Sequence, residues 1–430
     1  MILNDLQILA LILFAAMYAV MIIKPDYKIY SIWVVAIVYI IAGVLKERSP
    51  IYILTSINWN VIMMIGGTMV IVYFFIESKM PNRLAELILN RCKNVAWVII
   101  FMSVFAGIIS AFIDNVATVL MIVPVALAIC KKLKISPVSM ILSIAVSSNL
   151  QGAATLVGDT TSIMLGGYAN MNFMDFLWMN GKPGIFWSVE LGALATIPIM
   201  MVMFRKFNQP VSSDSHTKVV TYFPTISLIG IVVSLIIASF IPNTPDYING
   251  LICCIIALIT IIEDFIKNKK IEKIKNSILS VDFETLLILC GLFIVIQGIT
   301  DAGLIDLAAD SIVKIGGNSI FLLYTIIVWG SVALSAFIDN IPYVATMLPI
   351  IQQICLLLNI EPYLLYFGLL TGATLGGNIT PIGASANITA TGILKKNGHS
   401  ISFKDFTKIG IPFTLTAVTV GYLLIWFIWK

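Results

Sequence analysis

The chain has 430 residues, of which 59% are hydrophobic and only 11% are charged. A soluble globular domain carries about 25% charged residues, so this composition excludes a soluble protein. The net charge of +4 is small and resides in short loops, which argues against nucleic-acid binding. Only helices and closed barrels cross lipid, and the alternating pattern of barrel strands is absent. The sequence therefore predicts an all-α polytopic membrane protein.

Long apolar segments without charge follow one another along the chain, each long enough to cross a hydrocarbon core of roughly 30 Å as a helix. We expect about ten transmembrane helices, two of which are interrupted by glycine and proline. In chain order the expected crossings are 5–23, 28–45, 57–76, 138–170 (interrupted), 184–204, 222–241, 248–266, 281–299, 363–394 (interrupted) and 409–429.

Two further apolar stretches, 94–130 and 318–358, are about twice the length of one span and carry Asp-Asn pairs at their centres. Each could form two complete helices or a re-entrant helical hairpin. Basic residues flank the first stretch at both ends, and mainly acidic residues flank the second. Both ends of each stretch are therefore expected on one side of the membrane, with the two stretches on opposite sides. We predict two re-entrant hairpins.

Three loops rich in lysine and arginine, 205–218, 267–275 and 395–408, fall on the same side when the crossings are counted. The positive-inside rule places such loops in the cytoplasm. Both termini are then expected outside, and the protein is expected to be an integral, multi-pass component of the plasma membrane.

The hexapeptide Ser110–Asn115 recurs as Ser335–Asn340, which is an offset of 225 residues. Gly, Pro and Thr residues match in the same register, so we infer an internal duplication. Each unit contains an odd number of crossings, and the second unit is therefore inverted. The further matched pairs are Pro124 and Pro349, Gly152 and Gly377, Thr155 and Thr380, and Gly158 and Gly383.

Inverted repeats in helical membrane proteins are typical of secondary transporters, whose substrate site lies near the midplane between the repeats. We divide the chain into four parts on this basis. They are N-terminal scaffold helices at 1–50, a first repeat at 51–204, connecting helices and cytoplasmic loops at 205–280, and a second repeat at 281–430.

Polar residues inside the spans gather at the two hairpin tips and at the two interruptions that follow them. Broken backbone is tolerated in a membrane only where it is buried in protein or lines a wet cavity. Its free carbonyls, with Asn, Thr and Ser oxygens, suit a hard cation such as sodium. The candidate ion-binding residues are Asp114, Asn115, Thr118, Asn149, Gly152, Thr155, Asp159, Thr160, Ser162, Asp339, Asn340, Asn378, Thr380, Ser385 and Asn387.

Three carboxylates, Asp114, Asp159 and Asp339, lie within the apolar segments. An intramembrane carboxylate costs several kcal/mol and is functional by default, so these three are the candidate proton-coupling residues. Gly152, by contrast, could serve only close helix packing. Asn115 and Asn340 are the candidate ligands of a sodium ion. Sodium as a coupling ion is the only cofactor that we consider, because the six cysteines show no metal-ligand spacing.

The site lacks a fixed positive charge, because every lysine and arginine lies in a loop or at the end of a span. His216 and His399 also lie in loops, which excludes a histidine proton relay. The expected cargo is therefore a monovalent cation, a proton or a small neutral polyhydroxy species. The N-termini of half-helices keep an anion as an alternative.

Two other classes of function are weaker candidates. A passive ion channel would need no coupling residues, and an intramembrane aspartyl protease could use Asp114 and Asp339. Duplication already explains the symmetric placement of these two residues, so an enzyme is not expected. A pump that hydrolyses ATP by itself is not expected either, because the chain has no phosphate-binding GxxxxGK[ST] loop.

The tips and breaks together resemble those of the ion-transporter superfamily, over residues 57–425. This group includes arsenite permeases, NhaD-type sodium–proton antiporters and divalent-anion–sodium symporters. The SAFIDN tips and the second break, LGGNITPIGASAN at 375–387, look most similar to the P protein branch. The resemblance implies an elevator-type fold and a homodimer, in which hairpins and broken helices move against a scaffold.

The resemblance also bears on coupling. Sodium-coupled symporters of the superfamily carry Ser-Asn-Thr at their tips, whereas this chain has Asp114-Asn115-Val116 and Asp339-Asn340-Ile341. A buried carboxyl group can exchange a proton, so the replacement favours proton coupling. The implied function is a secondary active transporter, coupled to protons or sodium, for a monovalent cation or an arsenite-like metalloid. A sodium-coupled transporter of carboxylate-type anions is the alternative.

Overall fold

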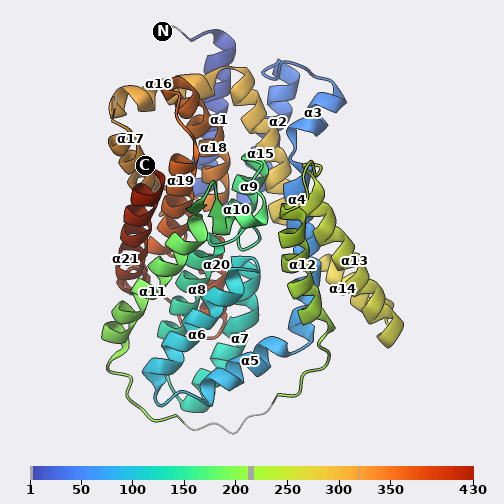
Figure 1. The fold of residues 1–430 in the computed structure, drawn as a ribbon, viewed down its shortest axis with the longest axis vertical. Helices are drawn as coiled ribbons and strands as arrows, with labels where there is room; N and C mark the ends of the chain where they lie inside the picture. The colour runs from blue at the N-terminus through green and yellow to red at the C-terminus, as the bar shows by residue number, and fades with distance from the viewer. Residues whose placement is uncertain (1–2, 212–216, 318) are drawn as a thin grey trace.

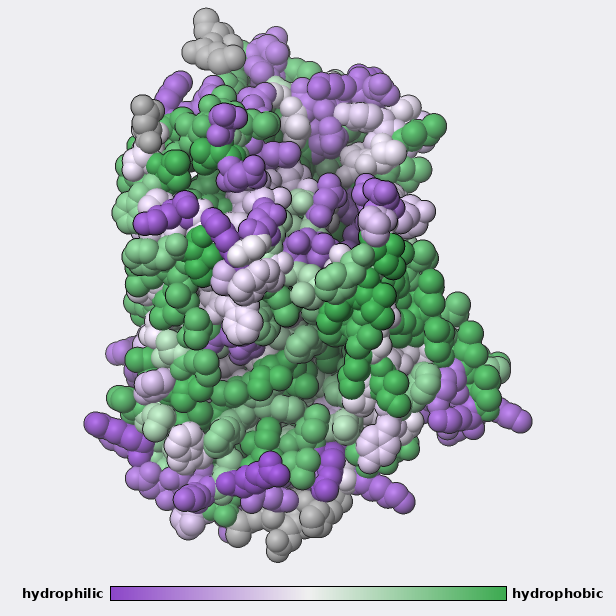
Figure 2. All heavy atoms as spheres, in the orientation of Figure 1, coloured by the Kyte–Doolittle hydropathy of each residue, from purple (hydrophilic) through white to green (hydrophobic). Residues whose placement is uncertain are grey.

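The computed structural model describes residues 3–211, 217–317 and 319–430, and these fold almost entirely into helices (Figure 1). Nine helices of the described part are long and apolar enough to cross a membrane, or ten if one bent pair is counted as a span. Apolar side chains dominate the middle of the face shown in Figure 2, and polar side chains gather toward its two ends. The predicted all-α polytopic fold is confirmed. His216 and the first residue of the predicted hairpin 318–358 lie outside the described residues.

The first half of the chain contains eleven α-helices and one small antiparallel hairpin, in which Trp178 pairs with Pro183. Its elements are α1 Asp5–Ile23, η1 Pro25–Tyr27, α2 Lys28–Ala42, α3 Pro50–Ser56, α4 Trp59–Glu77, α5 Met80–Leu89, α6 Val95–Ser110, α7 Asn115–Leu133, α8 Val138–Gly152, α9 Thr160–Tyr168, α10 Phe173–Leu177, β1 Trp178–Met179, β2 Lys182–Pro183 and α11 Ile185–Phe204.

The second half repeats the order of the long helices. Its elements are α12 Phe223–Ser239, α13 Ile248–Asn268, α14 Ile271–Leu279, α15 Phe283–Asp301, α16 Leu304–Gly316, α17 Ile320–Ser335, α18 Asn340–Leu358, α19 Tyr363–Gly376, η2 Gly377–Ile379, α20 Ser385–Lys396 and α21 Phe403–Trp429.

The contacts between helices follow the duplication. In the repeat, α2 corresponds to α13 and α4 corresponds to α15. Helix α13 packs along α4, and α2 packs along α15, so the same contact occurs twice with the two halves exchanged. Helices α5 and α16, which precede the two hairpins, lie at opposite ends of the molecule (Figure 1). The two hairpins therefore enter from opposite sides, which confirms the inverted-topology repeat.

Each predicted hairpin ends beside a predicted break. The hairpin α6–α7 turns at Ala111, whose carbonyl accepts a hydrogen bond from the Thr155 hydroxyl in the break between α8 and α9. The hairpin α17–α18 turns at Ala336, which accepts from Thr380 in the break between α19 and α20. Because the breaks interrupt spans, the tips end at the depth of those breaks, which confirms the re-entrant interpretation over four complete helices.

The helices form two groups. Helices α1, α2, α4, α12, α13 and α15 pack mainly on one another, and a second group holds the hairpins, the broken helices, α11 and α21. Within the second group α6 packs along α8, α17 along α19, and α11 along α21. The arrangement is that of the elevator-type transporter fold. Short helices such as α5, α14 and α16 were not expected from hydropathy, because their mixed polar and apolar faces give no continuous apolar run.

Candidate ion-binding site at the crossing of the two breaks

The aspartates of the two hairpin tips cap the helices that follow them. In the first tip, Asp114 Oδ2 accepts hydrogen bonds from the backbone N–H groups of Val116, at 3.0 Å, and Ala117, at 3.1 Å. In the second tip, Asp339 Oδ1 accepts from the N–H of Ile341 at 3.3 Å. The first N–H groups of a helix have no partner within the helix, and a carboxylate also interacts favourably with the helix dipole. Both carboxylates therefore stabilise the re-entrant tips.

This capping role predicts different effects for two substitutions at Asp114. Asparagine caps a helix about as well as aspartate does, whereas alanine costs about 1 kcal/mol. We expect Asp114→Asn to leave the melting temperature of the detergent-solubilised protein nearly unchanged, and Asp114→Ala to lower it. Equal melting temperatures for Asp114→Ala and the wild type would contradict the capping role.

Glycines allow the tips and breaks to approach closely. A Cβ atom on Gly158 would lie 2.7 Å from the carbonyl oxygen of Gly152 and 2.9 Å from those of Ser110 and Ala111. Its counterpart Gly383 is enclosed in the same way by three carbonyl oxygens at 2.7–2.8 Å. These atoms belong to backbone, so they cannot move aside without displacing the tip or the break.

The two halves of the chain are joined at Asn149, near the end of α8. Its Nδ2 donates to the Thr374 carbonyl at 2.6 Å and to Asn378 Oδ1 at 3.1 Å. Its Oδ1 accepts from Asn115 Nδ2, in the first tip, at 2.8 Å. Asn378 in turn donates to the Val146 carbonyl at 3.0 Å. One buried amide network thus connects the first tip, helix α8 and the second break.

Asp159 lies in the first break and is only 2% exposed. Its Oδ1 accepts from the N–H of Thr160 at 2.8 Å, and its Oδ2 accepts from Thr161 Oγ1 at 2.8 Å. Asn340 Nδ2, from the second tip, lies 3.4 Å from the same Oδ2. Asn340 directly follows Asp339 in the second tip. Thr161 and Thr374 join the first break to the amide network that holds Asn115, the residue after Asp114. The three predicted carboxylates therefore surround one region.

The duplication does not reproduce Asp159. The offset of 225 residues pairs Asp159 with Ala384 and Asn149 with Thr374, so the centre of the site is asymmetric although the surrounding backbone is symmetric. The tips and breaks contain no lysine or arginine. Asp159 is therefore a single, deeply buried carboxylate, and no basic side chain of the tips or breaks neutralises it.

The other predicted residues separate into two kinds. Ser385, the first residue of α20 after the second break, donates to Asp339 Oδ2 at 3.1 Å. Thr118 Oγ1 contacts the carbonyl of Ile113 at 3.4 Å and holds its own tip. Four more side chains bind backbone carbonyls of a tip or a break and so shape these loops: Thr155, Ser162, Thr380 and Asn387. Gly152 packs against Asp159, because a Cβ atom there would lie 2.8 Å from the Asp159 Cβ.

Three residues that contribute to the site were not among the predicted site residues. The hydroxyls of Thr161 and Thr374 lie 3.0 Å apart and link the first break to α19. Thr374 could have been found from the sequence, since it is the counterpart of Asn149 at the offset of the repeat. Ser148 was also missed, and its Oγ donates to Ser110 Oγ at 3.0 Å and to the Asn115 carbonyl at 3.1 Å.

An inverted repeat of membrane-spanning helices, with polar side chains where two broken helices cross, defines a membrane transporter. The chain belongs to the CitMHS family, described as citrate transporters, whose family model matches residues 9–354 and 270–430. This membership confirms the predicted likeness to the ion-transporter superfamily.

Individual relatives agree with this assignment. The chain is 28% identical to an uncharacterized transporter of Mycobacterium tuberculosis, over 86% of each protein. It is 23% identical to the P protein of Homo sapiens, over 97% of this chain and 59% of that protein.

Two solved structures share the fold. The YdaH transporter of Alcanivorax borkumensis superposes with a TM-score of 0.58 at 12% identity, over 87% of this chain and 86% of that chain. MtrF of Neisseria gonorrhoeae, whose structure is described as illuminating a class of antimetabolite efflux pumps, gives 0.54 at 15% identity, over 85% and 80% of the two chains. At these identities the likeness concerns the fold alone.

Proposed function

We propose that this transporter is secondary active, that it is coupled to protons or sodium, and that it moves a monovalent cation or a small arsenite-like metalloid. The observation that carries the proposal is the buried carboxylate of Asp159 at the crossing of the two repeats. A buried charge without a basic partner is unstable by several kcal/mol in order of magnitude. Asp159 must therefore bind a proton or a cation, and that requirement is the basis of coupling.

The neighbouring side chains suit a small cation. Asn115 and Asn340 both donate through Nδ2, to Asn149 and to Asp159 respectively. Their Oδ1 atoms are then the atoms that would face a bound ion, together with free carbonyls of the breaks. Oxygen ligands of this kind suit sodium, and a carboxylate suits a proton equally well.

Translocation would occur by movement of one group of helices against the other. The hairpins and broken helices pack mainly on one another, whereas α4 and α15 pack on α13 and α2. We propose that the first group carries the site across the bilayer while the second group remains fixed. A homodimer, held through the fixed group, would keep that group stationary in the lipid.

The basic loops give the orientation. We propose that the ends carrying 205–218, 267–275 and 395–408 face the cytoplasm, with both termini outside a plasma membrane. Alkaline phosphatase fused after Lys430 is then expected to be active in a bacterial host, and green fluorescent protein at the same position is expected to be dark. The reverse result would overturn the orientation.

The test of the proposed function is flux in proteoliposomes with imposed pH and sodium gradients. The cargoes compared are sodium, lithium, arsenite, antimonite and citrate. We expect uptake of one of the first four to depend on a pH or sodium gradient and to require Asp159. Rapid uptake without any gradient dependence would instead indicate a passive channel.

A carboxylate-type anion is the second candidate for the transported substrate, and two observations favour it. Helix α20 begins at the second break, and no side chain among the described residues caps its N-terminus. Helix N-termini attract anions. The family is also described by citrate transport. A trianion beside three carboxylates would need accompanying cations, so sodium- or proton-dependent citrate uptake, with no uptake of the small ions, would select this candidate.

A further inference from the structure

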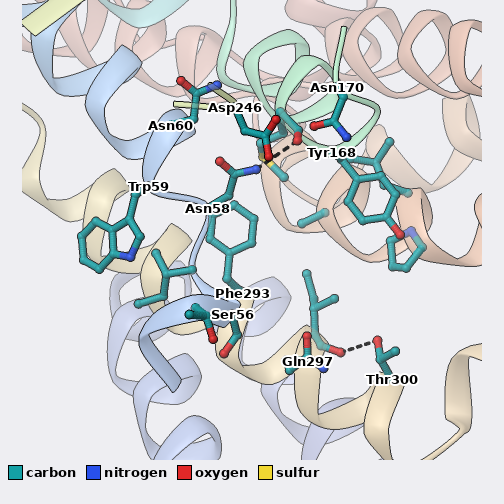
Figure 3. A pocket seen from close by; sticks show the side chains of 18 of the residues that line it. Ser56, Asn58, Trp59, Asn60, Tyr168, Asn170, Asp246, Phe293, Gln297 and Thr300 are labelled. Atoms are coloured by element: carbon teal, nitrogen blue, oxygen red, sulfur yellow. Dashed lines mark hydrogen bonds between the residues drawn. The ribbon is translucent and has the colours of Figure 1, made fainter. Parts of the chain in front are cut away.

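A cavity of about 450 Å³ lies between the two groups of helices, away from the amide network. Its walls come from the start of α4, the end of α9, the loop before α13, and the faces of α15 and α18. Figure 3 shows Asn58, Asn170 and Asp246 together at one end of the view, and Gln297 and Thr300 at the other. We call this cavity the vestibule.

The vestibule lies directly beyond the candidate site. Helix α9 begins beside Asp159 and lines the vestibule with Met164, and α18 begins at Asn340 and lines it with Ala345. Each helix thus advances five residues from the site, which is about 8 Å at 1.5 Å per residue. Helices α9 and α18 pack against each other. The part of the vestibule lined by Met164 and Ala345 is therefore about one and a half helical turns from Asp159 and Asn340.

The lining of the vestibule mixes apolar and polar side chains, and the charge that it carries is negative. Among the described residues that line it, Asp246 is the only charged one, and none is a lysine or an arginine. Apolar side chains form the larger part of the wall, and amide and hydroxyl groups stand among them, from Asn58, Asn60, Asn170 and Thr300 among others. A cleft of one charge sign raises the local concentration of ions of the opposite sign. An approaching anion would meet a carboxylate and no fixed positive charge.

We infer that the vestibule is a weak first binding site for the monovalent cation, which occupies it before reaching Asp159. Asp246 supplies the charge at its mouth, and amide and hydroxyl oxygens replace part of the hydration shell. The inference rests on the proposed function, because it assumes that a cation is carried or coupled. Cations would then enter the vestibule from the side of the membrane on which α3 and α16 lie (Figure 1).

The test is the dependence of flux on sodium concentration, with sodium added on the vestibule side of oriented proteoliposomes. We expect Asp246→Asn to raise the KM for sodium about threefold or more at low salt, with maximal flux unchanged, and Asp246→Lys to raise it further. An impermeant salt should reduce both effects, since screening acts over about 8 Å at physiological ionic strength. Asp310→Asn is the matched control, because Asp310 is exposed on α16 and does not line the cavity.

A steric variant provides an independent measurement. Thr300 is an exposed residue of the vestibule wall, so Thr300→Trp should lower flux from this side several-fold without unfolding the protein. Ser311→Trp, at an exposed position on α16, should have no effect.

The possible failures are distinguishable. If the flux of the wild type depends on neither a pH gradient nor a sodium gradient, the proposed function itself is wrong. If flux depends on a pH gradient and is independent of sodium, the proposed function stands and the vestibule inference is overturned. If flux depends on Asp159 but both Asp246 variants keep the wild-type KM at low salt, or Thr300→Trp keeps full flux, only the vestibule inference is overturned.

Discussion

Asp159→Asn is expected to lower gradient-driven transport by about 100-fold, which corresponds to about 2.7 kcal/mol in barrier height, while the protein remains folded. Asparagine has nearly the same shape as aspartate. Its Oδ1 can still accept from the N–H of Thr160, and its Nδ2 can donate to Thr161 Oγ1, whose hydroxyl can then donate to Thr374 Oγ1. It can neither bind a proton nor balance the charge of a cation. The loss should therefore fall on coupling and not on structure.

Proteoliposome flux under an imposed pH or sodium gradient measures this effect, and thermal melting in detergent checks the fold. Asp310→Asn, which removes a carboxylate from the exposed surface of α16, should transport like the wild type. Gradient-driven flux at the wild-type level in Asp159→Asn would refute the assignment of Asp159 as the coupling group.

The carboxylates of the two hairpin tips, Asp114 and Asp339, can be tested in the same flux measurement as Asp159. Because Asn preserves the helix cap, any fall in coupled flux in Asp114→Asn or Asp339→Asn reports on charge at the tips and not on their stability. The sequence predicts that both aspartates take part in proton coupling, and these two variants test that prediction independently of Asp159.

Gly158→Ala and Gly383→Ala are each expected to destabilise the protein strongly, although each substitution adds only one methyl group. Each added Cβ would lie within 2.9 Å of three backbone oxygens, so the hairpin tip must separate from the break. Overpacking typically costs about 1–3 kcal/mol, and we expect the upper end of this range, because no flexible side chain can yield. Separation would also weaken the bonds from Thr155 to Ala111 and from Thr380 to Ala336.

The measurement is the melting temperature together with the yield of monodisperse protein. Gly330→Ala on α17 is the matched control, since a Cβ there meets nothing within 4 Å and alanine favours helix by about 1 kcal/mol. It should melt at or above the wild-type temperature. Normal melting of both Gly158→Ala and Gly383→Ala would show that the tips and breaks are not held as closely as their carbonyl contacts indicate.

The sequence by itself determined the spans, the hairpins and the breaks, because a membrane makes these signals strong. Lipid excludes charges and unpaired backbone groups. Segments without charge therefore indicate membrane-spanning helices, and short Gly- and Pro-rich sequences within them indicate interruptions. The recurrence of Ser110–Asn115 at Ser335–Asn340 likewise predicted the inverted repeat, which the exchange of α2 and α13 between the halves confirms.

Only the tertiary structure decided which polar residues meet. Asn149 bonds to Asn378, 229 residues away, and Asp159 bonds to Asn340, 181 residues away. These pairs depend on how the two halves cross, and a local pattern contains no information on that crossing. The same holds for the vestibule, whose walls come from both groups of helices. The sequence supplied the polar residues of each tip and break, and the packing of one repeat against the other selected Asp159 as the carboxylate at their centre.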